Sequence, residues 1–317
     1  MSSSDQAAGP LAGAGRIGWI GIGRMGFAMA RRLAQAGASL AAYNRSVEKA
    51  QPLVAYGAKA VASISDLADS EIVFTMLSTG DVVRDVLLGD KGLLASNAKP
   101  RIIVDCSSIS VDDSNQVRAE LASADIAFLA APVSGNPHVV EAGKAGFVVS
   151  GPRSAFDQVR PVLVSMAQSA TYVGEGELAR IAKICHNVWL GSLTQSLAEV
   201  MVLAQKAGLT RSAFLEFINV CPMGSTYTRA KAPHWVALDF NATFTPVLMR
   251  KDLDMGIDLA HELGASLPLA SMTRDLIQSL INRGFSDKDF STLLLQQAEA
   301  SGLVMKPEGE APQVQGL

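Results

Sequence analysis

Three residues with acid–base or hydrogen-bonding side chains, Lys183, His186 and Asn187, lie within one long apolar segment, 178–208. The segment lacks proline, is rich in Ala and Leu and ends at Gly208, which is typical of a helix and its C-terminal stop. In a helix, the spacing i, i+3, i+4 places the three side chains on one face. An ammonium, an imidazole and a carboxamide are costly to bury without partners, so they are candidates for catalysis. The alternative is a solvated lysine beside a hydrogen-bonded His–Asn pair.

A glycine-rich turn connects an expected strand, 16–20, with an expected helix, 27–36. It reads Gly21-Ile22-Gly23-Arg24-Met25-Gly26, a G-x-G-x-x-G pattern in the strand–turn–helix context that gives the pattern its meaning. The first glycine permits the tight turn, the second lets the backbone approach a pyrophosphate, and the third lets the helix pack closely. Phosphates bind at such a helix N-terminus because its N–H groups and dipole favour an anion. These six residues are therefore predicted to bind a dinucleotide.

The end of the next expected strand, 39–43, indicates which nicotinamide cofactor is preferred. An NAD site places Asp or Glu near this point to bind the ribose 2′-hydroxyl, whereas this chain has Asn44-Arg45-Ser46. No carboxylate repels a 2′-phosphate there, and the Arg45 guanidinium can pair with one. We therefore predict NADP, with NADPH preferred over NADH. The alternative is that Arg45 only begins the next helix and both cofactors bind.

The rest of the N-terminal half alternates expected strands (72–76, 101–105, 126–130, 147–150 and 170–173) with expected helices (47–56, 82–88, 111–123 and 155–166). This alternation predicts a doubly wound α/β Rossmann-type domain with ligands at the carboxyl ends of its strands. Leu77-Ser78 and Ser107-Ser108 follow two of the strands and are expected to line the cofactor cleft. Serine is also common in helix caps and turns, which is the alternative for each.

A loop between two prolines, Ser134-Gly135-Asn136, offers a hydroxyl, a carboxamide and backbone N–H groups. These groups suit a carboxylate, and a plain turn is the alternative.

The second half of the chain has no convincing strand and is expected to be all-helical, with helices at 178–208, 211–220, 226–231, 245–263, 268–283 and 290–301. We predict a disordered tail (1–14), an NADP-binding domain (15–176), a helical domain for substrate binding and oligomerisation (177–303), and a flexible tail (304–317). The neighbours Lys251 and Asp252 are, by themselves, typical of a solvated helix face.

Composition excludes several classes of function. A net charge of −3 gives no general attraction to nucleic acid or to an anionic membrane. The three cysteines are scattered and the four histidines lack ligand spacing, so no metal site is predicted. No signal peptide and no membrane span are expected, which favours a cytoplasmic protein. The expected helix 178–208 is apolar around most of its circumference, which favours a homodimer or homotetramer.

Several stretches, in order and across nearly the whole chain, resemble the β-hydroxyacid dehydrogenase family, which includes 3-hydroxyisobutyrate dehydrogenase, tartronate semialdehyde reductase and 6-phosphogluconate dehydrogenase. They are the glycine motif with Asn44-Arg45-Ser46, Asp105-Cys-Ser-Ser108, Ala131-Pro-Val-Ser134-Gly135, Lys183-Ile-Cys-His186-Asn187 and Lys251-Asp252-Leu253. The chain departs from the 3-hydroxyisobutyrate branch at Asn136 and His186, where that branch usually has Gly and Asn.

The resemblance implies a hydride transfer between NADP(H) and a small β-hydroxy acid or its semialdehyde. Lys183 would be the catalytic acid/base and Asn187 its partner in holding the substrate. Ser134-Gly135, with Asn136, would bind the substrate carboxylate, and His186 adds a further hydrogen-bonding group. Ser108 would lie beside the nicotinamide, and Lys251 would close over cofactor and substrate.

Two other classes share this pattern. An imine or ketone reductase of the same fold usually has Asp or Tyr where Lys183 stands. A non-catalytic NADP-binding module would be expected to have lost the lysine or the glycines.

Overall fold

The computed structural model describes residues 11, 15–95 and 99–309. The chain divides into two compact units, Met1–Lys183 and Ile184–Leu317. The predicted fold class is confirmed: the first unit is a doubly wound α/β domain, and the second is helical. We predicted the boundary at residues 176–177, whereas the division falls inside the following helix, α6 (Leu178–Lys206).

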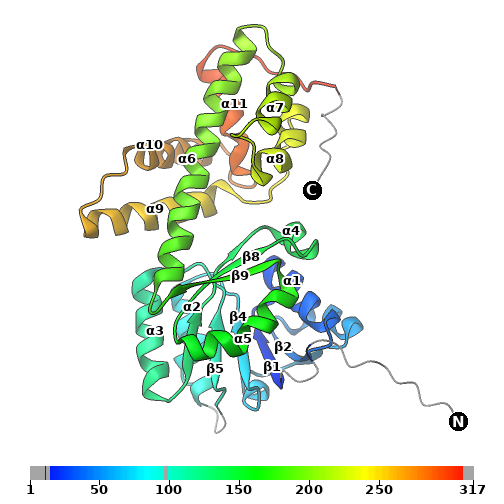
Figure 1. Cartoon of the computed structure of the whole chain (residues 1–317), viewed down its shortest axis with the longest axis vertical. Helices are drawn as coiled ribbons and strands as arrows, with labels where there is room; N and C mark the ends of the chain where they lie inside the picture. The colour runs from blue at the N-terminus through cyan, green and yellow to red at the C-terminus, as the bar shows by residue number, and fades with distance from the viewer. Residues whose placement is uncertain (1–10, 12–14, 96–98, 310–317) are drawn as a thin grey trace, which may run out of the picture. The chain divides into compact units, whose positions relative to one another are not determined.

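One sheet forms the centre of the first unit (Figure 1). It has nine strands within the described residues. The strands are β1 (Arg16–Ile20), β2 (Ser39–Tyr43), β3 (Lys59–Val61), β4 (Ile72–Thr75), β5 (Ile102–Asp105), β6 (Ala127–Ala130), β7 (Val133–Ser134), β8 (Gly146–Ser150) and β9 (Ser169–Gly174). Their order is β3-β2-β1-β4-β5-β6-β8-β7, with β9 paired to β8. The strands from β3 to β6 are parallel, whereas β8 runs antiparallel to β6 and β7. The strand order reverses between β1 and β4, and in such sheets ligands bind at the carboxyl ends of the strands beside this point.

Helices cover both faces of this sheet, and each face has its own hydrophobic core. The helices are α1 (Arg24–Gln35), α2 (Gly80–Leu88), α3 (Val111–Ser123), α4 (Pro137–Glu141) and α5 (Arg153–Met166). Trp19 and Phe74, stacked with ring centroids 5.3 Å apart, pack with side chains of α1 and α5. Val73 and Ile103 point to the other face and pack with α2 and α3. Burial on both sides is the reason these strands read as nearly continuous apolar runs.

The first unit differs from prediction between β2 and β4. The expected helix 47–56 forms two short 3₁₀ helices, η1 (Val47–Lys49) and η2 (Gln51–Tyr56), with Pro52 at the start of the second. Proline lacks the N–H that a continuous helix would need there. Strand β3 was missed because it has only three residues. Further 3₁₀ helices are η3 (Ile64–Leu67) and η4 (Leu93–Ala95).

Five further helices follow α6 in the described part of the second unit: α7 (Arg211–Val220), α8 (Thr226–Ala237), α9 (Pro246–Leu263), α10 (Pro268–Asn282) and α11 (Leu293–Ala300), the last preceded by the 3₁₀ helix η5 (Phe290–Thr292). One core joins α6, α7, α8 and α11 around Met201 and Trp235. A second joins α9, α10 and η5 around Leu253 and Ile277. Helix α8 continues past its predicted end because Pro233 is accommodated inside it.

The predicted tails lie largely outside the described residues, but two parts of them are placed. Leu11, within the expected tail 1–14, is buried in the core of the first unit. Glu308, within the expected tail 304–317, accepts hydrogen bonds from the backbone N–H groups of Arg211 and Ser212 at 3.0 and 2.8 Å. A carboxylate at the first turn of α7 is favoured by the helix dipole, which explains why this segment is held in place.

Candidate functional site

The glycine turn between β1 and α1 has the geometry expected of a dinucleotide-binding loop. Gly21 has a φ of 99°, and a Cβ there would collide with the carbonyl oxygen of Met76. A Cβ at Gly26 would collide with the carbonyl oxygen of Gly21, so the helix can approach the turn only because this residue is glycine. A Cβ at Gly23, by contrast, would meet no protein atom within 4 Å. Contacts within the described chain therefore explain the first and third glycines but not the second, which suits close approach by a ligand.

The N-terminus of α1 is suited to bind an anion. Gly23 is its N-cap residue, no side chain caps it, and no acidic residue lies in the first turn. Arg24 begins the helix and is exposed, whereas Met25 packs against the core. The loop therefore fits a dinucleotide pyrophosphate, which would bind to the backbone N–H groups of this first turn.

Asn44 holds the glycine turn against the end of β2. Its Oδ1 accepts a hydrogen bond from the N–H of Ile22 at 2.9 Å, and its Nδ2 donates to the carbonyl oxygen of Ser46 at 3.0 Å. The side chain thus joins the turn predicted to bind the pyrophosphate to the segment predicted to lie near the ribose 2′ position. Arg45, between Asn44 and Ser46, is exposed, so its guanidinium is accessible to a phosphate.

The segments that follow β4 and β5 are joined through Ser107. Its Oγ accepts a hydrogen bond from the N–H of Leu77 at 2.9 Å and donates to Oδ1 of Asp105 at 2.6 Å. Ser107 is fully buried, so the expectation that it lines the cofactor cleft is wrong; its role is to join the two segments. Ser78 is exposed and Ser108 is partly exposed, as a role in binding requires.

Cys106 lies between Asp105 and Ser107 and is buried. Burial raises the pKa of its thiol well above the usual value, so it is not a nucleophile at neutral pH.

The loop predicted to bind a carboxylate lies between β7 and α4. Ser134 ends β7, and Gly135 has a φ of 140°, a conformation that favours glycine. Asn136 is the N-cap of α4, and its Oδ1 accepts a hydrogen bond from the N–H of Val139 at 3.0 Å. The carboxamide oxygen is thus used locally, which leaves the amide nitrogen as the group suited to a carboxylate.

Helix α6 contains Lys183, His186 and Asn187, as predicted. Lys183, the last residue of the first unit, is half-buried. One turn before it, Arg180 is buried and ion-paired with Asp105 at 2.5 Å. The sequence reasoning missed this pair. The sequence did contain a signal for it. Glu177, Arg180 and Ile184 have the spacing of one helix face, so Arg180 lies on the same buried side as the apolar Ile184.

In the second unit, the carboxamide of Asn187 lies between an imidazole and a carboxylate. Its Nδ2 donates to Oδ2 of Asp252 at 2.6 Å, and its Oδ1 lies 2.8 Å from Nδ1 of His186. Because a carboxylate only accepts, the amide nitrogen must face Asp252 and the amide oxygen must face His186. The Nδ1 atom of His186 must therefore carry a hydrogen. Lys251 Nζ lies 3.5 Å from the other oxygen of Asp252, Oδ1.

Asp252 is 2% exposed, which corrects the interpretation of Lys251-Asp252 as a solvated pair. Two glycines bring its helix, α9, close to α6. A Cβ at Gly256 would collide with the side chain of Val188, and one at Gly191 would lie 3.1 Å from the sulfur of Met249. Close packing of two helices at small residues thus places the Asp252 carboxylate within hydrogen-bonding distance of Asn187.

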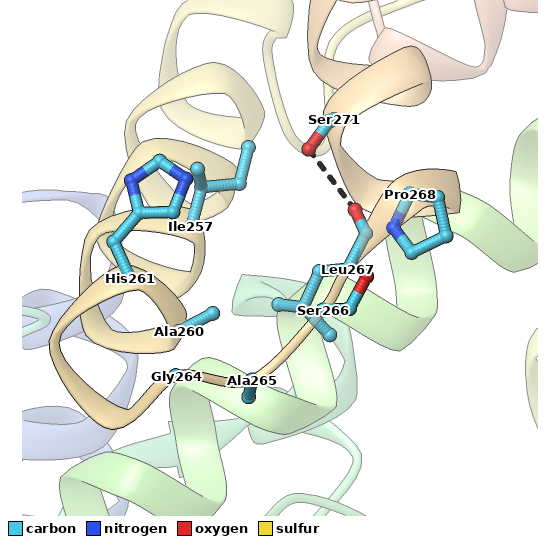
Figure 2. A pocket seen from close by; sticks show the side chains of 9 residues that line it. All are labelled: Ile257, Ala260, His261, Gly264, Ala265, Ser266, Leu267, Pro268 and Ser271. Atoms are coloured by element: carbon cyan, nitrogen blue, oxygen red, sulfur yellow. Dashed lines mark hydrogen bonds between the residues drawn. The ribbon is translucent and has the colours of Figure 1, made fainter.

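The structure also has a hollow of about 350 Å³ between the end of α9 and the start of α10 (Figure 2). His261 is the titratable residue at its edge, and the Ser271 hydroxyl donates to the carbonyl oxygen of Leu267 at 3.0 Å rather than pointing to a ligand. None of the predicted site residues lines it. Within the described ranges, no group of His, Cys, Asp or Glu side chains has the arrangement of a metal site. No helix there is long and apolar enough to span a bilayer.

Comparison with known proteins identifies the family of the chain. Residues 16–174 match the family model for the NAD-binding domain of 6-phosphogluconate dehydrogenase. Residues 177–296 match the model described as the NAD-binding domain of NADP-dependent 3-hydroxyisobutyrate dehydrogenase. The uncharacterized oxidoreductase YfjR of Bacillus subtilis is 35% identical over 282 residues, covering 88% of this chain and 98% of that one.

Two solved structures are also similar. The 3-hydroxyisobutyrate dehydrogenase of Mycobacterium tuberculosis, solved with L-serine, has a TM-score of 0.78 and 30% identity, covering 89% of this chain and 98% of that one. Psf3, in complex with NADP⁺ and 2-OPP, has a TM-score of 0.79 and 25% identity, covering 88% and 99%. The glycine turn, the fold and these matches define an NAD(P)-dependent oxidoreductase. The chain belongs to the β-hydroxyacid dehydrogenase family.

Proposed function

We propose that this protein transfers a hydride between NADP(H) and a small β-hydroxy acid or the corresponding semialdehyde, with Lys183 as general acid/base. The observation that carries the proposal is the presence of Lys183 and Asn187 in α6, with the Asn187 carboxamide held in one orientation by Asp252. An oriented amide can hold a substrate without first losing rotational freedom, which favours a productive geometry.

The nicotinamide cofactor, when bound, accepts the hydride from the carbinol carbon or returns it. In oxidation, the Lys183 amine takes the proton of the substrate hydroxyl as the C–H bond breaks and the carbonyl forms. In reduction, its ammonium gives that proton back. Ser134, the Gly135 backbone and the Asn136 amide nitrogen bind the substrate carboxylate. Asn187 and His186 hydrogen-bond to the substrate near the reacting hydroxyl.

The cofactor is held by the glycine motif, Gly21-Ile22-Gly23-Arg24-Met25-Gly26, and by Leu77, Ser78, Ser108 and Lys251. We propose that NADPH is preferred over NADH because the exposed Arg45 follows β2 where an acidic residue would be needed for the ribose 2′-hydroxyl. A guanidinium can bind a 2′-phosphate through two parallel hydrogen bonds.

The test is a panel of 3-hydroxyisobutyrate, 3-hydroxypropionate, glycerate, serine and threonate with NADP⁺ and NAD⁺. We expect turnover with NADP⁺ and one of these acids. Lys183→Ala should lower kcat by about 10²- to 10⁴-fold, the usual contribution of general acid–base catalysis, with NADPH affinity nearly unchanged. Turnover of Lys183→Ala within a few-fold of wild type would refute the assignment of Lys183.

We also propose that the protein is a homodimer or homotetramer. Large apolar side chains are exposed on α6 and after α7, including Trp189 at 65%, Leu203 at 68% and Met223 at 73%. Such side chains are normally covered in an oligomer. Sedimentation velocity should show a single species of at least twice the chain mass, and a monomer at micromolar concentration would contradict this proposal.

A further inference from the structure

Four charged side chains form a network under the start of α6. Arg180 donates through Nη2 to Oδ2 of Asp105 at 2.5 Å and through Nε to Oε2 of Glu177 at 3.1 Å. Arg118, from α3, donates to Oε1 of Glu177 at 2.7 Å. The side chains of Asp105 and Arg180 are 0% and 1% exposed. Two cations thus balance two carboxylates, and only Arg118, whose side chain is 19% exposed, reaches the surface.

The same network organises the ends of two strands on the cofactor side of the sheet. Arg180 Nη1 donates to the carbonyl oxygen of Ser107 at 2.9 Å, next to Ser108. The other oxygen of Asp105, Oδ1, accepts from the hydroxyls of Thr75 and Ser107 at 2.5 and 2.6 Å. Since Ser107 in turn receives the N–H of Leu77, one guanidinium holds both segments together.

Stability alone does not account for such a group. Buried ion pairs lose solvation that their mutual attraction only partly restores, so apolar side chains often stabilise a fold as well. A guanidinium, however, fixes several acceptors at once in a rigid plane, which apolar packing does not do.

We propose that Arg180 is a positioning residue that fixes the first turn of α6, and with it Lys183, against the segments that follow β4 and β5. Lys183 follows Arg180 by three residues, less than one helical turn. The inference rests on the proposed function, in which Lys183 exchanges a proton with the substrate beside Leu77, Ser78 and Ser108.

The test compares Arg180→Met and Arg180→Lys with Arg211→Met as matched control. Arg211 is also fully buried, but its guanidinium donates to the carbonyl oxygens of Trp235, Val236 and Lys306 in the second unit. We expect Arg180→Met and Arg211→Met to lower the melting temperature. At a temperature where both variants are folded, only Arg180→Met should lower kcat. The expected loss is about 10²-fold, which is the cost of misplacing a reacting group by about 1 Å. Arg180→Lys should be intermediate, because an ammonium lacks the planar fork.

The pH profile of kcat for oxidation gives a readout that a purely structural role would not move. The charged groups in the network are Asp105 from β5, Glu177 and Arg180 at the start of α6, and Arg118 from α3. Arg180→Met leaves one net negative charge, so the limb that reports deprotonation of Lys183 should move to higher pH. Asp105→Asn leaves one net positive charge and should move it to lower pH. The double variant should return it toward wild type.

Hydrogen exchange of the apoprotein gives a readout independent of turnover. Arg180→Met should accelerate exchange at the Leu77 N–H, which Ser107 protects, whereas Arg211→Met should not. The inference is overturned if the folded Arg180 variants keep wild-type kcat, pH profile and exchange at Leu77. If Arg180→Met does not fold, Arg180→Lys and Asp105→Asn decide by the same measurements. Failure of the proposed function is distinct, because Lys183→Ala would then keep its turnover whatever Arg180 does.

Discussion

Replacing Asp252 by Asn should loosen the carboxamide of Asn187 without removing it. In the wild type, the buried carboxylate accepts the Asn187 Nδ2–H at 2.6 Å and thereby turns the amide oxygen toward His186. An amide at position 252 can either accept from Asn187 or donate to it. Both orientations of Asn187 then become available, and only one of them matches the wild type.

The magnitude follows from the type of hydrogen bond. A hydrogen bond to a charged group contributes about 1.5–3 kcal/mol. If this energy holds the amide in the orientation that the transition state needs, kcat/KM should fall roughly ten- to a hundred-fold, since 1.36 kcal/mol corresponds to a factor of ten. Asp252 Oδ1 also lies 3.5 Å from Lys251 Nζ, so the NADPH dissociation constant must be measured separately.

Asp254→Asn is the matched control, because it removes the same charge from the same helix. Asp254 is partly exposed and binds Arg274 at 2.8 Å, an interaction of the kind that contributes at most about 1 kcal/mol. We expect its kcat/KM to stay within two- to three-fold of wild type.

Steady-state kinetics with the acid identified from the panel, together with urea unfolding, decide the matter. If both variants are folded and Asp252→Asn loses no more activity than Asp254→Asn, then Asp252 does not orient Asn187 for catalysis.

Four further predictions concern acid stability, cofactor choice and two glycines of the turn. Burial alone would raise the pKa of Asp289, but Lys231, at 2.7 Å, and neighbouring hydroxyls lower it from 3.8 to about 2. The carboxylate should therefore contribute about 2 kcal/mol to the free energy of unfolding above pH 4, and this contribution should be lost as the pH falls toward 2. Measured by urea unfolding, the free energies of wild type and Asp289→Asn should converge over this pH range. A difference that stays constant with pH would contradict the reasoning. Arg45→Glu should weaken NADPH binding at least tenfold more than NADH binding, measured by fluorescence titration; an equal loss for both would exclude a 2′-phosphate contact. Gly26→Ala should lower the free energy of unfolding by about 1–3 kcal/mol because its Cβ overlaps the Gly21 carbonyl. Gly23→Ala should leave the melting temperature unchanged and still weaken NADPH binding; normal binding would show that no ligand approaches there.

The local parts of this structure could be predicted from the sequence. The glycine turn is defined by short-range spacing, and the strands before Leu77 and Ser108, β4 and β5, are short apolar runs. The expected helix α3 (Val111–Ser123) matches the structure at both ends: the Ser110 side chain caps its start, and Asp125, with a φ of 57°, follows just after its end. The same reasoning failed at 47–56, where Pro52 interrupts an otherwise helical composition.

The partners of the candidate residues could not be predicted in the same way, because they come from distant segments. Asp105 and Arg180 are 75 residues apart, and Asn187 and Asp252 are 65 apart. Asp252 was interpreted by its neighbour Lys251, although its spacing from Met249, Leu253 and Gly256 places it on the buried face of α9. The position of the charged Asp252 on an apolar helix face was thus the signal in the sequence. Such a signal indicates that the carboxylate has a partner, but it does not identify the partner residue.

Three buried carboxylates show why identifying the partner matters. Asp289, like Asp105, accepts several hydrogen bonds, whereas Asp252 accepts one, from Asn187. The partners of Asp289 are Lys231, Thr243 and Ser291, none of which is a predicted site residue. It joins the loop before α9 to η5 and has a structural role. Asp105 and Asp252 instead bind groups next to Ser108 and Lys183 in one unit and Asn187 itself in the other. Burial of a carboxylate therefore does not by itself indicate function. Under the proposed function, Asp105 and Asp252 differ from Asp289 because Asp252 binds the proposed substrate-binding residue Asn187, and Asp105 binds Ser107, the neighbour of Ser108, and Arg180, the proposed positioning residue. On this criterion, Asp289→Asn should change stability without changing kcat in the folded protein, whereas Asp105→Asn and Asp252→Asn should change both.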